Sequence, residues 1–420
     1  MPPATDLLEE LRWRGMVAQV TGERLGAKLA SGSLAVYHGV DATAGSLHVG
    51  NLIGVLALRR FQAAGHRPVL LLGGGTTLIG DPSGKQAERP MRAAEEVESN
   101  VAAIRAQVGR LLDLERAEVV NNADWLCTTP LTDFLRDIGK HFTVNAMMAK
   151  ESVRARLEGR EQGISFTEFS YMLLQAYDYL RLFDGYGVRL QVGGSDQWGN
   201  ITAGVDLVRR ARAAEVDGLT WPLLTKPDGS KFGKSEEGNV WLDPAMTSPY
   251  QFFQYWMRAE DAAVVPLLKL FTDLDAGAVD AAAAGPAQQR AAQRTLATEV
   301  TAAVHGWEAA TDAAQAAAAL FGGDLGGLSE RSLLDTFAEA PSTALARSVL
   351  PAPLLDLLVR TGVSASRSAA RRDLEQGGVY LNNVRESDGE RLVTAGDLLA
   401  GRYLVVRRGK RNYHLVRFGE

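Results

Sequence analysis

The stretch Leu34-Ala-Val-Tyr-His-Gly-Val-Asp-Ala-Thr-Ala-Gly-Ser-Leu-His-Val-Gly-Asn51 passes from an apolar run into sequence with helical spacing. Residues 34–38 have the pattern of a short buried strand, and apolar residues recur at helical intervals over 52–62. A second apolar run, 68–72, comes next, and 188–192 is a further strand candidate. Strand, helix, strand in this order predicts a right-handed crossover in a parallel sheet. We therefore expect a Rossmann-like, doubly wound α/β domain that binds ligands at the carboxyl ends of its strands.

The composition narrows the class of protein. A chain of 420 residues with 46% hydrophobic and 23% charged residues is typical of a globular protein with two or three domains. No run of about 18 apolar residues exists, and the polar N-terminus lacks the pattern of a signal peptide, so we expect a cytoplasmic protein that does not bind membranes. The single cysteine, Cys127, excludes an internal disulfide and a multi-cysteine zinc site. The histidines are scattered, and no tightly bound metal is predicted.

The C-terminal segment differs from the rest of the chain in charge. Residues 351–420 contain 12 basic and 8 acidic residues, a local charge of +4, whereas the remaining residues carry −9. Basic modules bind polyanions because phosphate contacts release counterions. The pattern predicts either a polyanion site or a solvated basic surface.

Changes of composition divide the chain into expected domains. Residues 1–246 are expected to form the α/β domain, and 247–340 a small α-helical domain, since 276–320 are rich in alanine. Leu296, Val300, Val304 and Trp307 would supply the buried stripe of that domain. We expect a linker over 341–352 and an α+β domain over 353–420. The helix, turn and strand pattern of the last domain favours RNA rather than DNA.

The junction His48-Val-Gly-Asn51 is the first candidate site. The N-terminus of a helix exposes unpaired amides and a positive dipole, and both favour phosphate. Gly50 would let a nucleotide approach the backbone closely. The alternative is that His48 is only a neighbour of the helix cap.

Four other segments carry candidate binding groups. Residues 80–85 lack the order of a classical phosphate loop, and Asp81 is either a turn residue or a carboxylate facing an ammonium group. Tyr171, Gln175 and Asp178 share one helical face and would line a pocket or face solvent. The glycine-rich segment 193–200 follows a strand, and 231–235 places two lysines in a short loop. That loop would close over nucleotide phosphates or lie in solvent.

Together these segments resemble the bacterial tyrosyl-tRNA synthetases, a family of class I aminoacyl-tRNA synthetases, over nearly the whole chain. Residues 48–51 resemble the first class I signature, usually His-Ile-Gly-His, and 231–235 the second, usually Lys-Met-Ser-Lys-Ser. Residues 80–85, 170–178 and 193–200 are similar to the family's pocket segments, and 353–420 to its S-four-type RNA-binding domain. The resemblance implies a tyrosine–tRNA ligase that forms tyrosyl-adenylate from L-tyrosine and ATP with Mg²⁺, then charges tRNA(Tyr). It also implies that 247–340 lie on the anticodon side and that 125–160 include a dimer interface.

The resemblance further implies roles for individual residues. The tyrosine would be held by Tyr37, Asp81, Tyr171, Gln175, Asp178 and Gln197. ATP would contact Gly39, Asp41, Thr43, His48, Gly50, Gly194, Asp196 and Lys234. The catalytic set would be His48, Asn51, Lys85, Arg89, Lys231, Lys234 and Ser235. The tRNA would contact Arg367, Arg371, Arg372, Arg407, Arg408 and Lys410.

One departure and two rival functions remain. Asn51 stands where the usual signature has histidine, and its amide can still donate to a ribose or phosphate oxygen. A tryptophanyl-tRNA synthetase shares the catalytic fold, but Tyr37 with Asp178 favours tyrosine. A noncatalytic RNA-binding protein on a synthetase scaffold is opposed by the retained signature residues.

The resemblance also implies a homodimer. Residues 134–151 include Phe142, Met147 and Met148, which would form an interface helix or part of a monomer core.

Overall fold

The computed structural model describes residues 6–81, 92–150, 153–154, 164–224, 232–235, 238–286, 289–409 and 412–419, with only the main chain for 234 and 235. The chain divides into two compact units, Met1–Asp243 with Ala263–Ala281, and Pro244–Ala262 with Ala282–Glu420. No helix within the described ranges has the length and apolar character needed to cross a bilayer.

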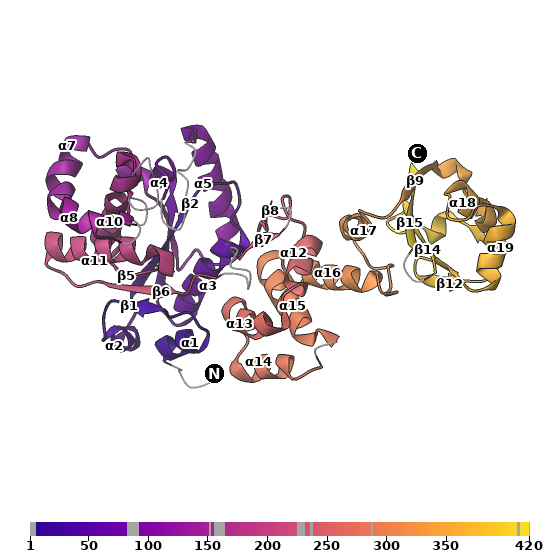
Figure 1. Ribbon diagram of the computed structural model, residues 1–420, viewed down its shortest axis with the longest axis horizontal. Helices are drawn as coiled ribbons and strands as arrows, with labels where there is room; N and C mark the ends of the chain where they lie inside the picture. Colours follow the sequence, from indigo (N-terminus) through magenta and orange to yellow (C-terminus); the bar gives the residue numbers. More distant parts are fainter. Residues whose placement is uncertain are drawn as a thin grey trace. The chain divides into compact units, whose positions relative to one another are not determined.

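The first unit is built on a mixed sheet in the order β1-β6-β5-β2-β3-β4 (Figure 1). Its parallel strands are β2 (Ala35–Asp41), β3 (Arg67–Gly73), β4 (Glu118–Asn121), β5 (Val188–Gly194) and β6 (Asp217–Trp221), and β1 (Gln19–Val20) pairs antiparallel to β6. The chain winds outward in both directions from β2 and β5, so the topological switch point lies between these two strands. This topology confirms the predicted doubly wound sheet.

Helices connect the strands of the first unit. They are α1 (Leu7–Trp13), α2 (Leu25–Ser31), α3 (Val49–Ala63), α4 (Gly74–Thr77), α5 (Ala94–Val108), α6 (Ala123–Leu126), α7 (Leu131–Asp133), α8 (Val144–Met148), α10 (Phe166–Tyr186) and α11 (Trp198–Arg212). A π-helical turn, η1 (Phe134–Ile138), and a 3-10 turn, η2 (Gly139–His141), follow α7. Ser165 caps the first turn of helix α10, and Gly187, with φ of 64°, ends the helix.

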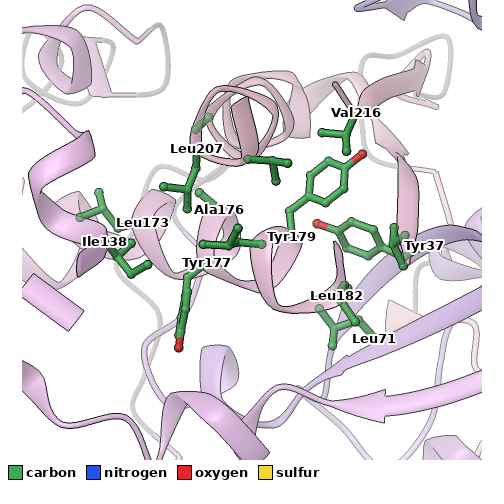
Figure 2. Close-up of a cluster of buried hydrophobic side chains, with 14 of the residues drawn as sticks. Tyr37, Leu71, Ile138, Leu173, Ala176, Tyr177, Tyr179, Leu182, Leu207 and Val216 are labelled. Atoms are coloured by element: carbon green, nitrogen blue, oxygen red, sulfur yellow. The ribbon is translucent and has the colours of Figure 1, made fainter. Parts of the chain in front are cut away.

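A buried cluster joins β2 to α10 (Figure 2). The rings of Tyr37 and Tyr179 meet edge to face, with 5.1 Å between centroids. The Tyr179 hydroxyl donates to the Asp217 carbonyl at 2.7 Å. This packing fixes the rotation of α10, and therefore the face on which Tyr171, Gln175 and Asp178 lie.

The second unit begins with helices. They are α12 (Pro249–Met257), α15 (Ala291–His305), α16 (Trp307–Ala319) and α17 (Glu330–Thr336), while α13 (Asp261–Phe271) and α14 (Ala276–Ala283) belong mainly to the first unit. Leu296, Val300 and Val304 are buried as predicted, but Trp307 is 62% exposed. The prediction for Trp307 was wrong because Gly306, with φ of 90°, ends α15 and turns the chain before α16.

The C-terminal part of the second unit is α+β, as predicted. Its sheet has the order β12-β11-β14-β15-β9, formed by β9 (Ser342–Ala346), β11 (Val379–Leu381), β12 (Val384–Glu386), β14 (Tyr403–Arg408) and β15 (Asn412–Gly419). Helices α18 (Leu354–Arg360) and α19 (Arg367–Glu375) supply apolar residues to its core. A two-stranded ribbon joins β10 (Ala352–Pro353) to β13 (Leu392–Val393).

Residues 341–352, expected to be a linker, contain β9, which pairs parallel to β15 from Ser342 to Ala346. The segment also includes a 3-10 turn, Arg347–Val349, and the start of β10. The proline content suggested a linker, but the main chain of 342–346 completes the edge of the sheet. This part of the segment therefore belongs to the C-terminal sheet.

Candidate active site

A cavity of about 930 Å³ opens where β2 and β5 separate. Its lining includes all the residues that were predicted to bind tyrosine, namely Tyr37, Asp81, Tyr171, Gln175, Asp178 and Gln197. It is also lined by the predicted nucleotide and signature residues Gly39, Asp41, Thr43, His48, Gly50, Asn51, Gly194 and Asp196. The fold thus brings together segments that are spread from residue 37 to residue 197.

The carboxylate of Asp178 lies at one end of the cavity and is 2% exposed. It accepts a hydrogen bond from Trp125 Nε1 at 2.8 Å and one from Asn122 Nδ2 at 2.9 Å. The Tyr37 hydroxyl is buried and has no hydrogen-bond partner among the described residues. A ligand hydroxyl that reached this end would satisfy a group whose burial unpaired is costly.

Burial is the main cause of the pKa shifts of Asp178 and Tyr37. It raises the pKa of Asp178 to about 7, against the hydrogen bonds from Asn122 and Trp125, and the negative Asp41 raises it further. Burial, with the nearby Asp178 carboxylate, also raises the pKa of Tyr37. Tyr37 is therefore a neutral hydroxyl at physiological pH, able to donate and to accept.

A second group of side chains forms a connected network beside Asp81. Gln197 Nε2 donates to Asp81 Oδ2 at 2.9 Å, and Asn200 Nδ2 donates to Gln197 Oε1 at 3.1 Å and to Gln175 Oε1 at 2.9 Å. Gln175 and Asp81 thereby present oxygens at the same cavity as the Tyr171 side chain. Such oxygens suit a ligand ammonium group. Asp81 is 8% exposed, which favours the pocket reading over the turn reading.

The two signature segments meet through the main chain. The Val49 amide donates to the Val240 carbonyl at 2.9 Å, and the Leu242 amide donates to the Leu47 carbonyl at 2.8 Å. A small hairpin of β7 (Lys234–Ser235) and β8 (Gly238–Asn239) precedes Val240. The hairpin that carries Lys234 is thus attached to the start of α3.

Helix α3 begins at Val49, and His48 is its N-cap residue. The His48 amide donates to Asn51 Oδ1 at 3.2 Å, so Asn51 caps the helix with its carbonyl oxygen. A Cβ at Gly50 would lie 2.8 Å from the His48 ring, so glycine leaves the first helical turn open. Both the cap and a phosphate contact are compatible with this geometry, because the Asn51 amide nitrogen is a separate donor.

Asp41 and Asp196 supply carboxylates at the ends of β2 and β5. Thr76 Oγ1 donates to Asp41 Oδ1 at 2.9 Å, and Asn122 Nδ2 donates to Thr76 Oγ1 at 3.0 Å. Hydrogen bonds therefore connect Asp41 to Asp178 through Thr76 and Asn122. A Cβ at Gly194 would lie 2.5 Å from Asp196 Oδ1, so a side chain there would displace this carboxylate.

His38 also lines the cavity, and its neighbours explain how it fits. Its Nδ1 lies 3.1 Å from the Val192 carbonyl, and burial lowers its pKa to about 4, against that hydrogen bond. The ring is neutral near pH 7. A Cβ at Gly54 on α3 would lie 2.1 Å from His38 Nε2, so the imidazole occupies the space that Gly54 leaves.

Other predicted residues lie elsewhere or outside the described ranges. Lys85, Arg89, Lys231 and Lys410 lie outside the described residues, as do the side chains of Lys234 and Ser235. Arg367 and Arg371 are exposed on α19 and pair with Asp356 and Glu390, each at 3.2 Å. Three more arginines were predicted to bind tRNA. Arg372 is exposed on α19, and the half-buried Arg407 lies over the Tyr380 ring. Arg408 forms an ion pair with Asp373.

Asn122, Trp125 and Thr76 are site residues that sequence reasoning missed. Asn122 follows β4, a strand of four residues that is too short for a clear apolar pattern. Its amide oxygen also accepts from the Gly75 amide at 2.8 Å, which ties the glycine cluster at 73–75 to the end of β4. A polar residue directly after a parallel strand was the available signal.

Comparison with known proteins identifies the family. The profile "tRNA synthetases class I (W and Y)" matches residues 29–322, and "Tyrosine--tRNA ligase SYY-like C-terminal domain" matches residues 332–416. The tyrosine–tRNA ligases of Roseiflexus castenholzii and Bacillus caldotenax are each 50% identical to the chain over 98% of its length, and 99% and 100% of theirs. A C-terminally truncated mitochondrial tyrosyl-tRNA synthetase of Aspergillus nidulans has a TM-score of 0.67 and 32% identity, covering 74% of this chain and 92% of that one.

The doubly wound sheet and the joined signature segments are those of a class I aminoacyl-tRNA synthetase. Both domains match in order, and the identity extends over almost the full length of the relatives. The chain belongs to the bacterial tyrosine–tRNA ligase family.

Proposed function

We propose that the protein activates L-tyrosine with ATP and transfers it to tRNA(Tyr), and that the residues described above carry out this reaction. One observation carries the assignment of residues. The buried Asp178 carboxylate and the Tyr37 hydroxyl, which has no hydrogen-bond partner among the described residues, line the same cavity as His48 and Gly50. A phenol needs both an acceptor and a hydroxyl neighbour, and a phosphate needs the helix N-terminus.

In the first step, a carboxylate oxygen of tyrosine attacks the α-phosphorus of ATP. A new P–O bond forms, the bond to the bridging oxygen breaks, and pyrophosphate leaves. We propose that Asp81, Tyr171 and Gln175 hold the ammonium group while Gln197 faces the carboxylate. ATP enters as its Mg²⁺ complex, so the metal arrives with the substrate.

The nucleotide end would act mainly by positioning and by donors matched to developing charge. We assign the ribose and phosphate contacts to Gly39, Asp41, Thr43, His48, Gly50, Asn51, Gly194 and Asp196. Lys85, Arg89, Lys231, Lys234 and Ser235 would engage the leaving pyrophosphate in the transition state. No side chain forms a covalent bond in this mechanism.

In the second step, a hydroxyl of the terminal ribose of tRNA attacks the activated carbonyl carbon and AMP leaves. We propose that the arginines of α19 and β14, with Lys410, bind the tRNA backbone. Their excess of positive charge over the rest of the chain supports this part of the proposal. A cytoplasmic location belongs to the same proposal, as do the domain boundaries expected from the sequence, except that residues 342–346 pair with β15 in the C-terminal sheet.

Pyrophosphate exchange into ATP with each of the twenty amino acids tests the activity. Exchange with tyrosine and only weak exchange with tryptophan or phenylalanine is the expected result, because phenylalanine would leave the buried polar groups unpaired. Strong exchange with tryptophan would support the tryptophanyl rival. Exchange with no amino acid would support a noncatalytic RNA-binding protein.

We extend the proposal to a homodimer. Met147 is 6% exposed and packs in the monomer core, but five large apolar side chains of the same region are 46–78% exposed, namely Leu131, Leu135, Val144, Met148 and Phe166. Exposed apolar groups gathered in one region mark protein interfaces. These residues would contact a second copy of the chain.

Light scattering at micromolar concentration tests the homodimer. A dimer is expected for the wild-type protein and a monomer for Val144→Glu. Leu392→Glu, at an exposed apolar position of the second unit, is the control and should stay dimeric. A monomeric wild-type protein would contradict the dimer.

A further inference from the structure

In the loop of the second signature, Phe232 packs against an aromatic ring of α13, a helix that lies far from it in the sequence. The rings of Phe232 and Phe271 stack, with 5.6 Å between centroids and 26° between planes. Phe232 is half-buried, whereas Phe271, the last residue of α13, is fully buried. Offset stacking at this distance is a favourable geometry for aromatic pairs.

Buried arginines hold the end of α13 in place. Arg60 Nη2 donates to the carbonyls of Leu270 and Thr272 at 3.0 and 2.8 Å. Arg14 donates to Thr272 as well, and its Nη2 reaches the Leu274 carbonyl at 3.2 Å. Both guanidiniums are about 5% exposed, and charged donors at a helix C-terminus match its partial negative charge. Phe271 is therefore a fixed ring.

Helix α3 connects this anchor to the first signature. Arg60 lies near the C-terminal end of α3, while His48 and Gly50 lie at its N-terminal end. The helix thus contacts the anchor of Phe271 at one end and the signature loop at the other.

The main chain next to Phe232 is also closely constrained. Gly233 has φ of 89°, and a Cβ there would lie 2.9 Å from the Gly50 amide nitrogen. The Val240 amide donates to the Gly233 carbonyl at 3.1 Å. Between these contacts the chain direction leaving Phe232 is fixed, and the next residue is Lys234.

We propose that Phe271 is a positioning residue for amino-acid activation. Its ring stacks against Phe232 and holds it in place, and this contact fixes the position of the Lys234 main chain relative to the N-terminus of α3. This inference rests on the proposed function of Lys234. A buried phenylalanine in a helical core would otherwise contribute only to stability. The positioning role requires that removal of either ring act on the same step and through the other ring.

A double-mutant cycle of Phe232→Leu and Phe271→Leu tests the coupling. Each single change should lower the rate of tyrosyl-adenylate formation by about tenfold, while the tyrosine dissociation constant stays within about twofold. The double variant should be little slower than the slower single variant, because the second change removes a contact that is already lost. Losses that multiply would overturn the proposal.

Phe61→Leu is the matched control. Phe61 is fully buried on α3 and packs against His66, with 5.8 Å between ring centroids. This change also removes a core ring, so it should lower the stability of the first unit but leave the adenylation rate within about twofold. An equal loss of rate in this variant would reduce Phe271 to a core residue.

Amide hydrogen exchange gives a readout that needs no activity. The Val240 amide should exchange faster in Phe271→Leu and in Phe232→Leu than in wild type, and should be unchanged in Phe61→Leu. If the Val240 amide exchanged at the wild-type rate in both Phe232→Leu and Phe271→Leu, the proposed positioning of the loop by Phe271 would be overturned. If the wild-type protein shows no tyrosine-dependent pyrophosphate exchange, the proposed function fails, whereas amide exchange still decides whether Phe271 seats the loop. Phe232→Leu, at the half-buried ring, covers the case in which Phe271→Leu does not fold.

Discussion

Side-chain hydrogen bonds organise the cavity around Asp178, whereas main-chain hydrogen bonds organise it around Gly50. Around Asp178, polar side chains from separate elements converge, and each is held by another: Trp125 and Asn122 donate to Asp178, and Thr76 joins Asn122 to Asp41. Around Gly50, by contrast, main-chain hydrogen bonds join the start of α3 to residues 240–242, which follow the β7–β8 hairpin. A ring of fixed side chains suits recognition of one side chain, whereas the positive end of a helix dipole suits a phosphate.

Lys234→Ala tests the Gly50 end and has the largest expected effect. Loss of a donor to developing charge should lower the adenylation rate by about 10²–10³-fold, with the tyrosine dissociation constant nearly unchanged. Pre-steady-state kinetics measure both quantities. Lys269→Ala, at a lysine that contacts the Trp13 ring, should have no effect. Equal losses in rate and in tyrosine affinity would mean that Lys234 only binds the ground state.

Asn122→Ala tests the Asp178 end. The change removes donors to Asp178 and Thr76, so kcat/KM for tyrosine should fall about 10- to 100-fold, with KM for ATP nearly constant. The control is Asn121→Ala, since the side-chain oxygen of the neighbouring Asn121 accepts from the Gly74 and Ala123 amides rather than bonding to Asp178. An effect confined to ATP would place Asn122 at the other end of the cavity.

The titration of Asp178 should appear in stability. Its pKa is raised to about 7 in the folded protein, so the folded state holds the proton more tightly than the unfolded state does. The stability contributed by this group is fully present below about pH 4 and is lost as pH rises through about 7, by at most about 1.4 kcal/mol per pH unit. Denaturant unfolding of wild type and Asp178→Asn between pH 4 and 8 measures it. A constant difference between the two proteins over that range would show that burial does not shift this carboxyl.

Arg371→Ala has the smallest expected effect and acts outside the cavity. KM for tRNA should rise about threefold, and the salt dependence of tRNA binding should weaken by about one phosphate contact. Adenylate formation should not change. Arg12→Ala, which removes an exposed arginine paired with Glu9 in the first unit, is the control. Equal effects of the two changes would remove α19 from the proposed tRNA surface.

The sequence predicted those parts of the molecule that depend on local pattern. Strands β2, β3 and β5 and helix α3 were found because their apolar residues are continuous or periodic. The face of α10 followed from its spacing. Asn122 and Phe271 were not found, because their roles depend on partners 56 and 39 residues away in the chain, Asp178 and Phe232. Strand β9 was missed because main-chain pairing with β15 leaves little trace in composition.

The fit of His38 against Gly54 has a consequence for evolution. The imidazole occupies the volume that any side chain at position 54 would need, so neither position is free to drift alone. A lineage that gains a side chain at 54 should first, or at the same time, exchange His38 for a smaller residue. Aligned relatives should therefore show the two positions varying in opposite size, and a reconstructed ancestor carrying bulky residues at both should lose function until one of them shrinks.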